Sequence, residues 1–229
     1  MLRHECGLSP DAFVVDVAAG TGLLTEIFLA ADFAVTAIEP NAEMRAACSE
    51  LETIYPKLRC IQGTAEETGL PYRSAALITV AQAMHWFDLE RTQAEFARIL
   101  KPRGCCAVIY NNRHVGGDEF HDAYEQFLME FGIDYESVKQ QHVGRKRLSQ
   151  FFAPAQMHCA EFPNSQALMW DAFEGRVFSS SYIPRPGHEH FHQMQSELQR
   201  LFDRHQSGGV VSMGYDCVVC YGQIAKATS

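Results

Sequence analysis

The chain has 229 residues, of which 47% are apolar and 21% charged, a composition that excludes a disordered chain and suits one large domain. Asp and Glu number 28 against 19 Lys and Arg, and the formal charge of −9 disfavours nucleic acid as a partner. The sequence has no apolar run of membrane-spanning length and no signal-peptide pattern at its N-terminus. We therefore expect a cytoplasmic protein with no membrane partner.

Strands and helices alternate through the first half of the chain, which predicts a parallel sheet covered by helices on both faces. Helices are predicted to begin near Gly22, Asn41 and Leu89, with Asn41 as an N-cap. The third of these helices is expected to stop at the segment KPRG, residues 101–104. The predicted strands are 12–17, 34–38, 58–62, 75–81 and 105–110.

The alternation ends after Tyr110. Residues 113–205 are predicted to be mostly helical, with one strand near 158–162, and the segment GVVSMGYDCVVCYGQI near the C-terminus is predicted to return to the sheet as a strand. The basic segment GRKR, residues 144–147, is interpreted as a solvated loop or helix face.

Eight cysteines are scattered along the chain, and without a secretion signal they are expected to be reduced thiols. Cys217 and Cys220 form a C-x-x-C motif inside a predicted strand, where residues three apart point to opposite faces. The residues His188, His190 and His192 lack a further ligand one helical turn away. We predict no metal site at either place.

The stretch VVDVAAGTGLL stops an apolar run at Asp16, passes through Gly20 and Gly22, and resumes at helical spacing. A strand, a glycine turn and a helix N-terminus form an anion site, because free N–H groups and the helix dipole favour negative charge. The dinucleotide fingerprint requires a third glycine where this chain has Thr25, and Asp16 would repel a pyrophosphate. An amino acid, with an ammonium and a carboxylate, fits this loop better.

The second predicted strand ends at Glu39, which lies 39 − 16 = 23 residues after Asp16. A doubly wound fold places there the acid that binds ribose hydroxyls. Combined with the glycine loop, this position predicts a ligand in which an amino acid is joined to a nucleoside. That ligand is S-adenosylmethionine.

These residues resemble the class I S-adenosylmethionine-dependent methyltransferases, of the type 11-like, small-molecule kind. The resemblance extends through the segments GTAEETGLP, ITVAQAMHWFD, RILKPRG, YNNR and GRVFSSSYIP. It implies an α/β fold with a doubly wound, Rossmann-like seven-stranded sheet, mostly parallel with an antiparallel C-terminal strand, and a helical insertion after the fifth strand. Within the single domain we expect a cofactor-binding half at about 11–112, an acceptor-pocket or lid region at about 113–205 and a returning strand at about 206–229.

The resemblance also implies which residues bind the cofactor. The methionine moiety is assigned to the loop residues Asp16, Ala18, Gly20 and Gly22, and the ribose and adenine to Glu39 and Pro40. Adenine recognition is further assigned to Thr64, Ala65 and Glu66, and the methionine ammonium to the Ala81 carbonyl and Gln82. Ala18 and Thr64 replace the Gly and Asp that relatives have, and Ala18 is expected to allow the turn if its φ is negative.

Methyl transfer displaces a leaving group that needs no protonation, so a base is required only for a protonated acceptor. His85, after the fourth predicted strand, is the candidate base or acceptor-positioning residue, with packing as its alternative role. Trp86 is expected to wall the acceptor pocket or to face the cationic centre of the cofactor with its π surface, and an ordinary half-buried Trp is its alternative. Further acceptor-binding candidates are Asn111, Arg113 or Arg176, and Tyr182.

The predicted function is therefore methyl transfer from S-adenosylmethionine to a small molecule, at an oxygen, nitrogen or carboxylate. The first alternative is an NAD(P)-dependent oxidoreductase, against which the missing third glycine counts. The second is a cofactor-binding module with little turnover, because few residues precede the first predicted strand where relatives carry a longer segment. The sequence predicts neither the acceptor nor the oligomeric state.

Overall fold

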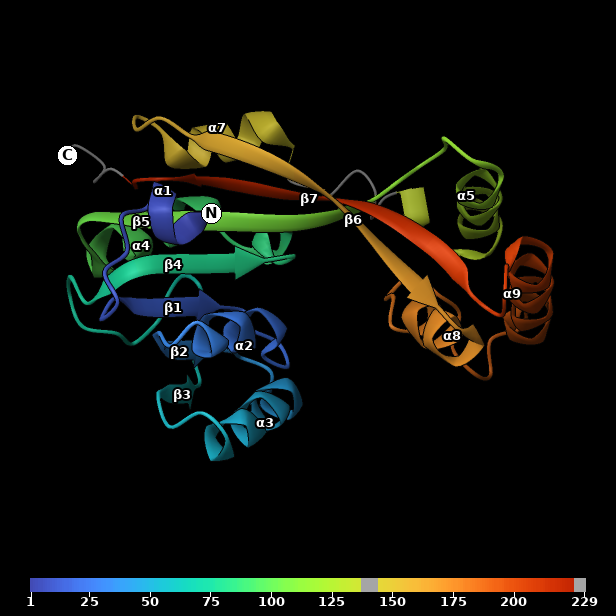
Figure 1. Cartoon of the computed structure of the whole chain (residues 1–229), viewed down its shortest axis with the longest axis horizontal. Helices are drawn as coiled ribbons and strands as arrows, with labels where there is room; N and C mark the ends of the chain where they lie inside the picture. Colours follow the sequence, from blue (N-terminus) through green and yellow to red (C-terminus); the bar gives the residue numbers. More distant parts are fainter. Residues whose placement is uncertain (137–143, 225–229) are drawn as a thin grey trace. The chain divides into compact units, whose positions relative to one another are not determined.

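The computed structural model of the chain describes residues 1–136 and 144–224 (Figure 1). Its strands form a seven-stranded sheet in the order β3-β2-β1-β4-β5-β7-β6, which confirms the predicted fold class. The strands are β1 (Phe13–Val17), β2 (Ala34–Ile38), β3 (Leu58–Ile61), β4 (Ala75–Ala81), β5 (Leu100–Arg113), β6 (His158–Leu168) and β7 (Val211–Gly222).

Helices connect these strands and follow the predicted starts closely. Asn41 is the N-cap of α3, and its side chain accepts hydrogen bonds from the N–H groups of Glu43 and Met44, each at 3.0 Å. The helices are α1 (Leu2–Glu5), α2 (Leu23–Ala30), α3 (Ala42–Glu50), η1 (Leu51–Thr53), η2 (Met84–Trp86), α4 (Leu89–Ile99), α5 (Glu119–Phe131), α7 (Arg145–Phe152), α8 (Trp170–Phe178) and α9 (Phe191–His205). Within the described residues, no helix combines the length and apolarity needed to cross a bilayer.

The first five strands are parallel, and their register brings their carboxyl ends to one edge. Val17 pairs with Ile38 of β2 and with Val80 of β4. Val80 in turn pairs with Val108 of β5. The residues that follow these strands therefore share the edge at which open α/β sheets bind ligands.

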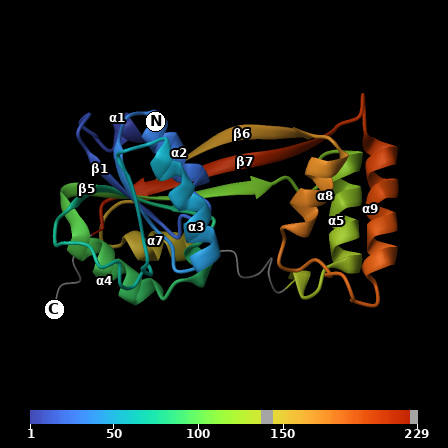
Figure 2. The ribbon, with the colours of Figure 1, turned by 90° about the horizontal axis from the view of Figure 1, so that it is seen from below.

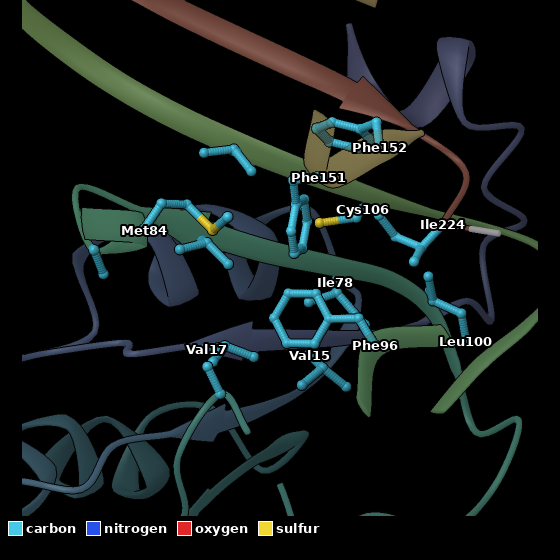
Figure 3. Packing of buried hydrophobic residues seen from close by; sticks show 14 of the residues in the cluster. Val15, Val17, Ile78, Met84, Phe96, Leu100, Cys106, Phe151, Phe152 and Ile224 are labelled. Atoms are coloured by element: carbon cyan, nitrogen blue, oxygen red, sulfur yellow. The ribbon is translucent and has the colours of Figure 1, made fainter. Parts of the chain in front are cut away.

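Two apolar layers cover the two faces of these strands. Val15 and Val17 contact the layer that contains Phe96 of α4 and Phe151 of α7 (Figure 3). Val14 points to the opposite face, because side chains alternate along a strand, and joins the layer of α2 and α3. Both faces are buried, as expected for a parallel sheet.

The chain divides into two compact units. The sheet unit comprises Met1–Tyr110 and the described residues of Val143–Ala160 and Val218–Ser229. The helical unit comprises Glu161–Cys217 and the described residues of Asn111–His142. In the helical unit α5, α8 and α9 lie side by side (Figure 2), and Phe173 and Leu198 are fully buried in its own core.

Helix α4 ends at the KPRG segment as predicted, but this segment is already part of the following strand. Helix α4 stops at Ile99, and Leu100–Arg113 is one strand that already includes Pro102. The reason is an irregularity in the pairing with β4: Ala75 pairs with Leu100, but Leu77 pairs with Cys105. The extra residues form a bulge, where a proline is tolerated because no ladder hydrogen bond is required of it.

The prediction of eight reduced thiols is wrong for one pair. Cys159 of β6 and Cys220 of β7 form a disulfide, with Cα atoms 4.1 Å apart and a sequence separation of 61. These strands are neighbours in the sheet, which places the two residues opposite each other. Cys217 lies in the same strand as Cys220 and is a free thiol. As predicted, residues 144–147 are exposed, three of them on the first turn of α7.

Candidate cofactor-binding site

The loop between β1 and α2 is built from residues with left-handed backbone conformations. Gly20 has φ +58° and Gly22 has φ +90°. A Cβ added to Gly22 would lie 2.8 Å from Leu51 Cδ1 and 2.9 Å from Cys48 Sγ, whereas one added to Gly20 would meet nothing within 4 Å. Gly22 is therefore required both by its backbone and by the atoms packed behind it.

Ala18 departs from the sequence expectation. Its φ is +55°, so the turn forms without the negative φ on which the expectation depended. A left-handed residue with a Cβ costs about 1–2 kcal/mol relative to the right-handed conformation. The turn is therefore kept in a strained backbone conformation at this position.

Glu39 follows β2, and only 6% of the residue is exposed. Its Oε2 accepts a hydrogen bond from the Gly20 N–H at 2.8 Å, and its Oε1 accepts one from the Asn41 N–H at 2.9 Å. A carboxylate offers about four acceptor positions, so lone pairs stay available for a ligand. Glu39 thus ties the glycine loop to the start of α3. Arg45 holds the same turn, because its Nη1 donates to the carbonyls of Glu39 at 2.7 Å and Pro40 at 3.0 Å.

Asp16 is buried beneath the loop, with 1% of the residue exposed. Its Oδ2 accepts a hydrogen bond from Thr25 Oγ1 at 2.6 Å, and its Oδ1 accepts one from Thr79 Oγ1 at 2.8 Å. Burial raises the pKa of this carboxyl to about 6, and the two hydroxyl hydrogen bonds oppose part of the rise. Because the folded-state pKa exceeds the unfolded one, protonation stabilises the fold, and this contribution is lost as the pH rises from about 4 to about 6.

The residues assigned to adenine lie in the turn after β3. Ala65 is buried, and Thr64 Oγ1 accepts a hydrogen bond from the Glu67 N–H at 3.2 Å. Glu66 Oε1 accepts the Asp88 N–H at 3.0 Å. Since Asp88 is the N-cap of α4, the Glu66 carboxylate is engaged at the start of that helix.

At the end of β4 the chain turns sharply. The Gln82 N–H donates to the Ile109 carbonyl at 3.0 Å, which extends the β4–β5 ladder by one residue, and Gln82 then has φ +57°. The short helix η2 follows and contains His85 and Trp86, whose ring centroids are 4.7 Å apart. Trp86 is 72% exposed, so in this structure it is not the half-buried residue of the alternative interpretation.

The remaining acceptor candidates lie in the helical unit. Arg113 forms an ion pair with Glu125, donates to Tyr135 OH at 3.0 Å and stacks over the Tyr124 ring at 4.8 Å. Asn111 Oδ1 accepts a hydrogen bond from Asn164 at 3.4 Å. The other candidates lie on or after α8: Arg176 Nε donates to Tyr215 OH at 3.3 Å, and the Tyr182 ring lies 5.0 Å from that of Tyr135.

No set of three or more His, Cys, Asp or Glu side chains within residues 1–136 and 144–224 could hold a metal ion. Of the three histidines in the HEHFH stretch, two contact each other: His188 Nδ1 accepts the His190 N–H at 3.2 Å.

The sequence analysis missed the residues that support the loop from behind. Thr25 was considered only because the dinucleotide fingerprint has a glycine at its position, but its hydroxyl donates a hydrogen bond to Asp16. Thr79 and Arg45 gave no sequence signal, because their partners are distant in the chain or are backbone carbonyls.

Comparisons with known proteins agree with this geometry. A family model described as a methyltransferase domain matches residues 15–108. An uncharacterized methyltransferase of Mycobacterium tuberculosis is 33% identical over 151 residues, which cover 66% of this chain and 58% of the relative. An uncharacterized methyltransferase of Schizosaccharomyces pombe is 30% identical over 113 residues, covering 49% of this chain and 44% of the relative. The chain thus spans under two thirds of the length of these relatives.

Solved structures share the fold at low identity. A proposed type II methyltransferase from Anaeromyxobacter dehalogenans has a TM-score of 0.68 at 20% identity, with 97% of this chain and 94% of that chain covered. A geranyl diphosphate C-methyltransferase from Streptomyces coelicolor, solved with S-adenosyl-L-homocysteine, has a TM-score of 0.52 at 14% identity, with coverages of 98% and 76%. Residues 15–108 are thus similar to a methyltransferase domain, and the chain shares its fold with solved methyltransferase structures.

Proposed function

We propose that this protein transfers the methyl group of S-adenosylmethionine to a small-molecule acceptor. The observation that carries the proposal is the hydrogen bond from the Gly20 N–H to the Glu39 carboxylate at 2.8 Å. It joins the loop assigned to the amino acid with the acid assigned to the ribose. The register of β1 and β2 places both at the carboxyl edge of the sheet.

The residues present fit the two ends of this cofactor. Backbone N–H groups at the start of α2 suit a carboxylate, and Glu39 has lone pairs left for ribose hydroxyls. We assign a supporting role to Asp16, because only 1% of the residue is exposed and its carboxylate accepts hydrogen bonds from Thr25 and Thr79 beneath the loop. The residues proposed to contact the cofactor are Ala18, Gly20, Gly22, Glu39, Pro40, Thr64, Ala65, Glu66, Ala81 and Gln82.

When bound, the cofactor would supply a sulfonium methyl group, whose transfer requires no protonation of the leaving group. The protein therefore has to align the acceptor and exclude water, and it removes a proton only when the acceptor carries one. We propose His85 as the base for an oxygen or nitrogen acceptor. A carboxylate acceptor, which is ionised at neutral pH, would need no base.

Acceptor recognition is proposed for His85 and Trp86 and for the region of about 113–205, including Asn111 and Tyr182. An acidic acceptor would need an arginine that is not already neutralised. Arg113 is paired with Glu125, whereas among the described residues Arg176 has no carboxylate within ion-pair distance. This difference favours Arg176 over Arg113 for a bidentate contact to such an acceptor.

Calorimetric titration with S-adenosylhomocysteine tests cofactor binding, and NAD serves as the control ligand. We expect binding of the first compound only. In Glu39→Ala the affinity should fall by about 1–3 kcal/mol, because the ribose hydroxyls lose charge-assisted hydrogen bonds. The exposed neighbour Glu43 provides the matched control, Glu43→Ala, in which affinity should be unchanged.

Binding of NAD with no response to S-adenosylhomocysteine would contradict the proposal. Turnover is then tested by release of S-adenosylhomocysteine in the presence of panels of carboxylate, hydroxyl and amine acceptors. A protein that binds the cofactor and methylates nothing in these panels would instead be a binding module.

A further inference from the structure

Two thiols from different elements of the sheet unit meet behind the glycine loop. Cys48 lies on α3 and is fully buried, and Cys60 lies on β3 and is partly exposed. Their Sγ atoms are 3.3 Å apart. A disulfide has a sulfur–sulfur distance of about 2.05 Å, so the two atoms need to approach by about 1.3 Å to form one.

The buried member of this pair also contacts the loop. A Cβ on Gly22 would lie 2.9 Å from Cys48 Sγ, so a larger residue at this position would collide with that sulfur atom. The Gly22 N–H donates to the Ala19 carbonyl at 3.0 Å, and the Gly22 carbonyl accepts the Glu26 N–H at 2.8 Å at the start of α2. A movement of Cys48 Sγ therefore changes the packing at Gly22 and, through the Gly22 carbonyl, the start of helix α2.

We propose that Cys48 and Cys60 form a reversible disulfide when the protein is oxidised by a peroxide, and that this bond weakens cofactor binding. The disulfide itself is independent of the activity, whereas its effect on affinity rests on the proposed function. Formation of the bond draws Cys48 Sγ toward β3 and away from the position against which Gly22 packs. The turn then loses the contact that supports its left-handed conformation.

The oxidation follows in two balanced steps. The Cys60 thiolate, at the partly exposed position, attacks one peroxide oxygen; the O–O bond breaks, and Cys60 becomes a sulfenic acid while the other oxygen leaves as water. Cys48 then attacks the Cys60 sulfur, the S–O bond breaks and a second water leaves. In total two thiols and one hydrogen peroxide give one disulfide and two waters, and a dithiol reductant reverses the change.

The environments of the two thiols determine which of them reacts first with the peroxide. Burial, the Cys60 thiol and the carboxylates of Asp16 and Glu52 raise the pKa of Cys48 to about 12. Cys48 is therefore a poor first nucleophile at neutral pH, since the thiolate is the reactive form. It is suited to the second step, in which its partner is already activated and lies beside it.

The experiment treats the full chain with hydrogen peroxide, blocks free thiols by alkylation and maps disulfides by mass spectrometry of peptides. The same samples are titrated with S-adenosylhomocysteine before and after treatment. The test variant is Cys60→Ser, which removes the exposed thiol. The matched control is Cys105→Ser, which removes a different thiol that also contacts a cysteine, Cys6.

We expect a Cys48–Cys60 linked peptide in the wild type and in Cys105→Ser, and its absence in Cys60→Ser. Oxidation should raise the Kd for S-adenosylhomocysteine by about five-fold or more in the first two proteins, and dithiothreitol should restore it. The Kd of Cys60→Ser should change by less than about two-fold, which also controls for the Cys159–Cys220 bond.

Peptide maps in which Cys48 and Cys60 are both alkylated after oxidation of folded protein would overturn the proposal. A linked peptide with an unchanged Kd would overturn its effect on the cofactor. Failure of the reduced wild type to bind S-adenosylhomocysteine would instead count against the proposed function, and the peptide map would still decide whether the disulfide forms.

Discussion

Gly22→Ala tests the packing behind the glycine loop. The new Cβ would have to occupy a left-handed conformation, at about 1–2 kcal/mol, and would lie 2.8 Å from Leu51 Cδ1 and 2.9 Å from Cys48 Sγ. Leu51 is partly exposed and can move its side chain, but Cys48 is fully buried. Overpacking of a buried contact costs about 1–3 kcal/mol.

The matched control is Gly20→Ala in the same loop. Gly20 also has a positive φ, but its Cβ would meet nothing within 4 Å. Both substitutions reduce the entropy of the unfolded chain equally, so that contribution cancels in the comparison. We therefore expect Gly22→Ala to lose about 1–3 kcal/mol more free energy of unfolding than Gly20→Ala.

Urea unfolding followed by circular dichroism measures both losses, and a double-mutant cycle isolates their cause. In Gly22→Ala with Cys48→Ala the blocking sulfur is absent, so the combined loss should be smaller than the sum of the two single losses by about 1 kcal/mol. Equal losses for Gly20→Ala and Gly22→Ala, or a cycle with no coupling, would refute the packing argument.

Three further changes address the strain, the buried acid and the disulfide. Ala18→Gly should raise the free energy of unfolding by up to about 1 kcal/mol, because relief of the left-handed strain exceeds the entropic cost of glycine; a loss in urea unfolding would contradict this. Asp16→Asn should be more stable than the wild type at pH 7 by about 1–3 kcal/mol and should lack the wild type's fall in stability from about pH 4 to pH 6; parallel pH profiles of the two proteins would contradict it. Cys159→Ser should lose about 4 kcal/mol without reductant, from the 61-residue separation that the bond closes, and nothing with dithiothreitol present, and a loss that persists in reductant would assign it to packing.

Much of the sheet unit could be predicted, because the conformations that its local sequence favours are also those that its tertiary packing requires. The strands β1, β2 and β4 are short apolar runs bounded by turn residues, and they are mostly buried. Asn41 could be identified as an N-cap from its residue type and the apolar stripe that follows it. At such positions a sequence window of a few residues contains the interactions that determine the structure.

Other features depend on contacts that no local window contains. The bulge that accommodates Pro102 depends on the register with β4, and the Cys159–Cys220 bond depends on the order of the last two strands. The same holds for the site. Glu39 could be predicted from its spacing, but its hydrogen bond to the Gly20 N–H depends on the pairing of β1 with β2. Residue type and spacing indicate which groups the edge contains, and the register determines which of them meet.

The positive φ values show how the edge is formed. Ala18 and Gln82 follow neighbouring strands, and neither is a glycine. The ladder continues to the point where each strand ends, since the Ala19 N–H donates to Ile38 and the Gln82 N–H donates to Ile109. A left-handed residue at that point turns the chain sharply and stops the strand, which a relaxed extended residue would not do. Strain of this kind persists only where the surrounding structure enforces it, and it is concentrated in proteins at ligand-binding sites. Its presence on two adjacent strands, at the edge that also bears Glu39, therefore supports the proposed cofactor site.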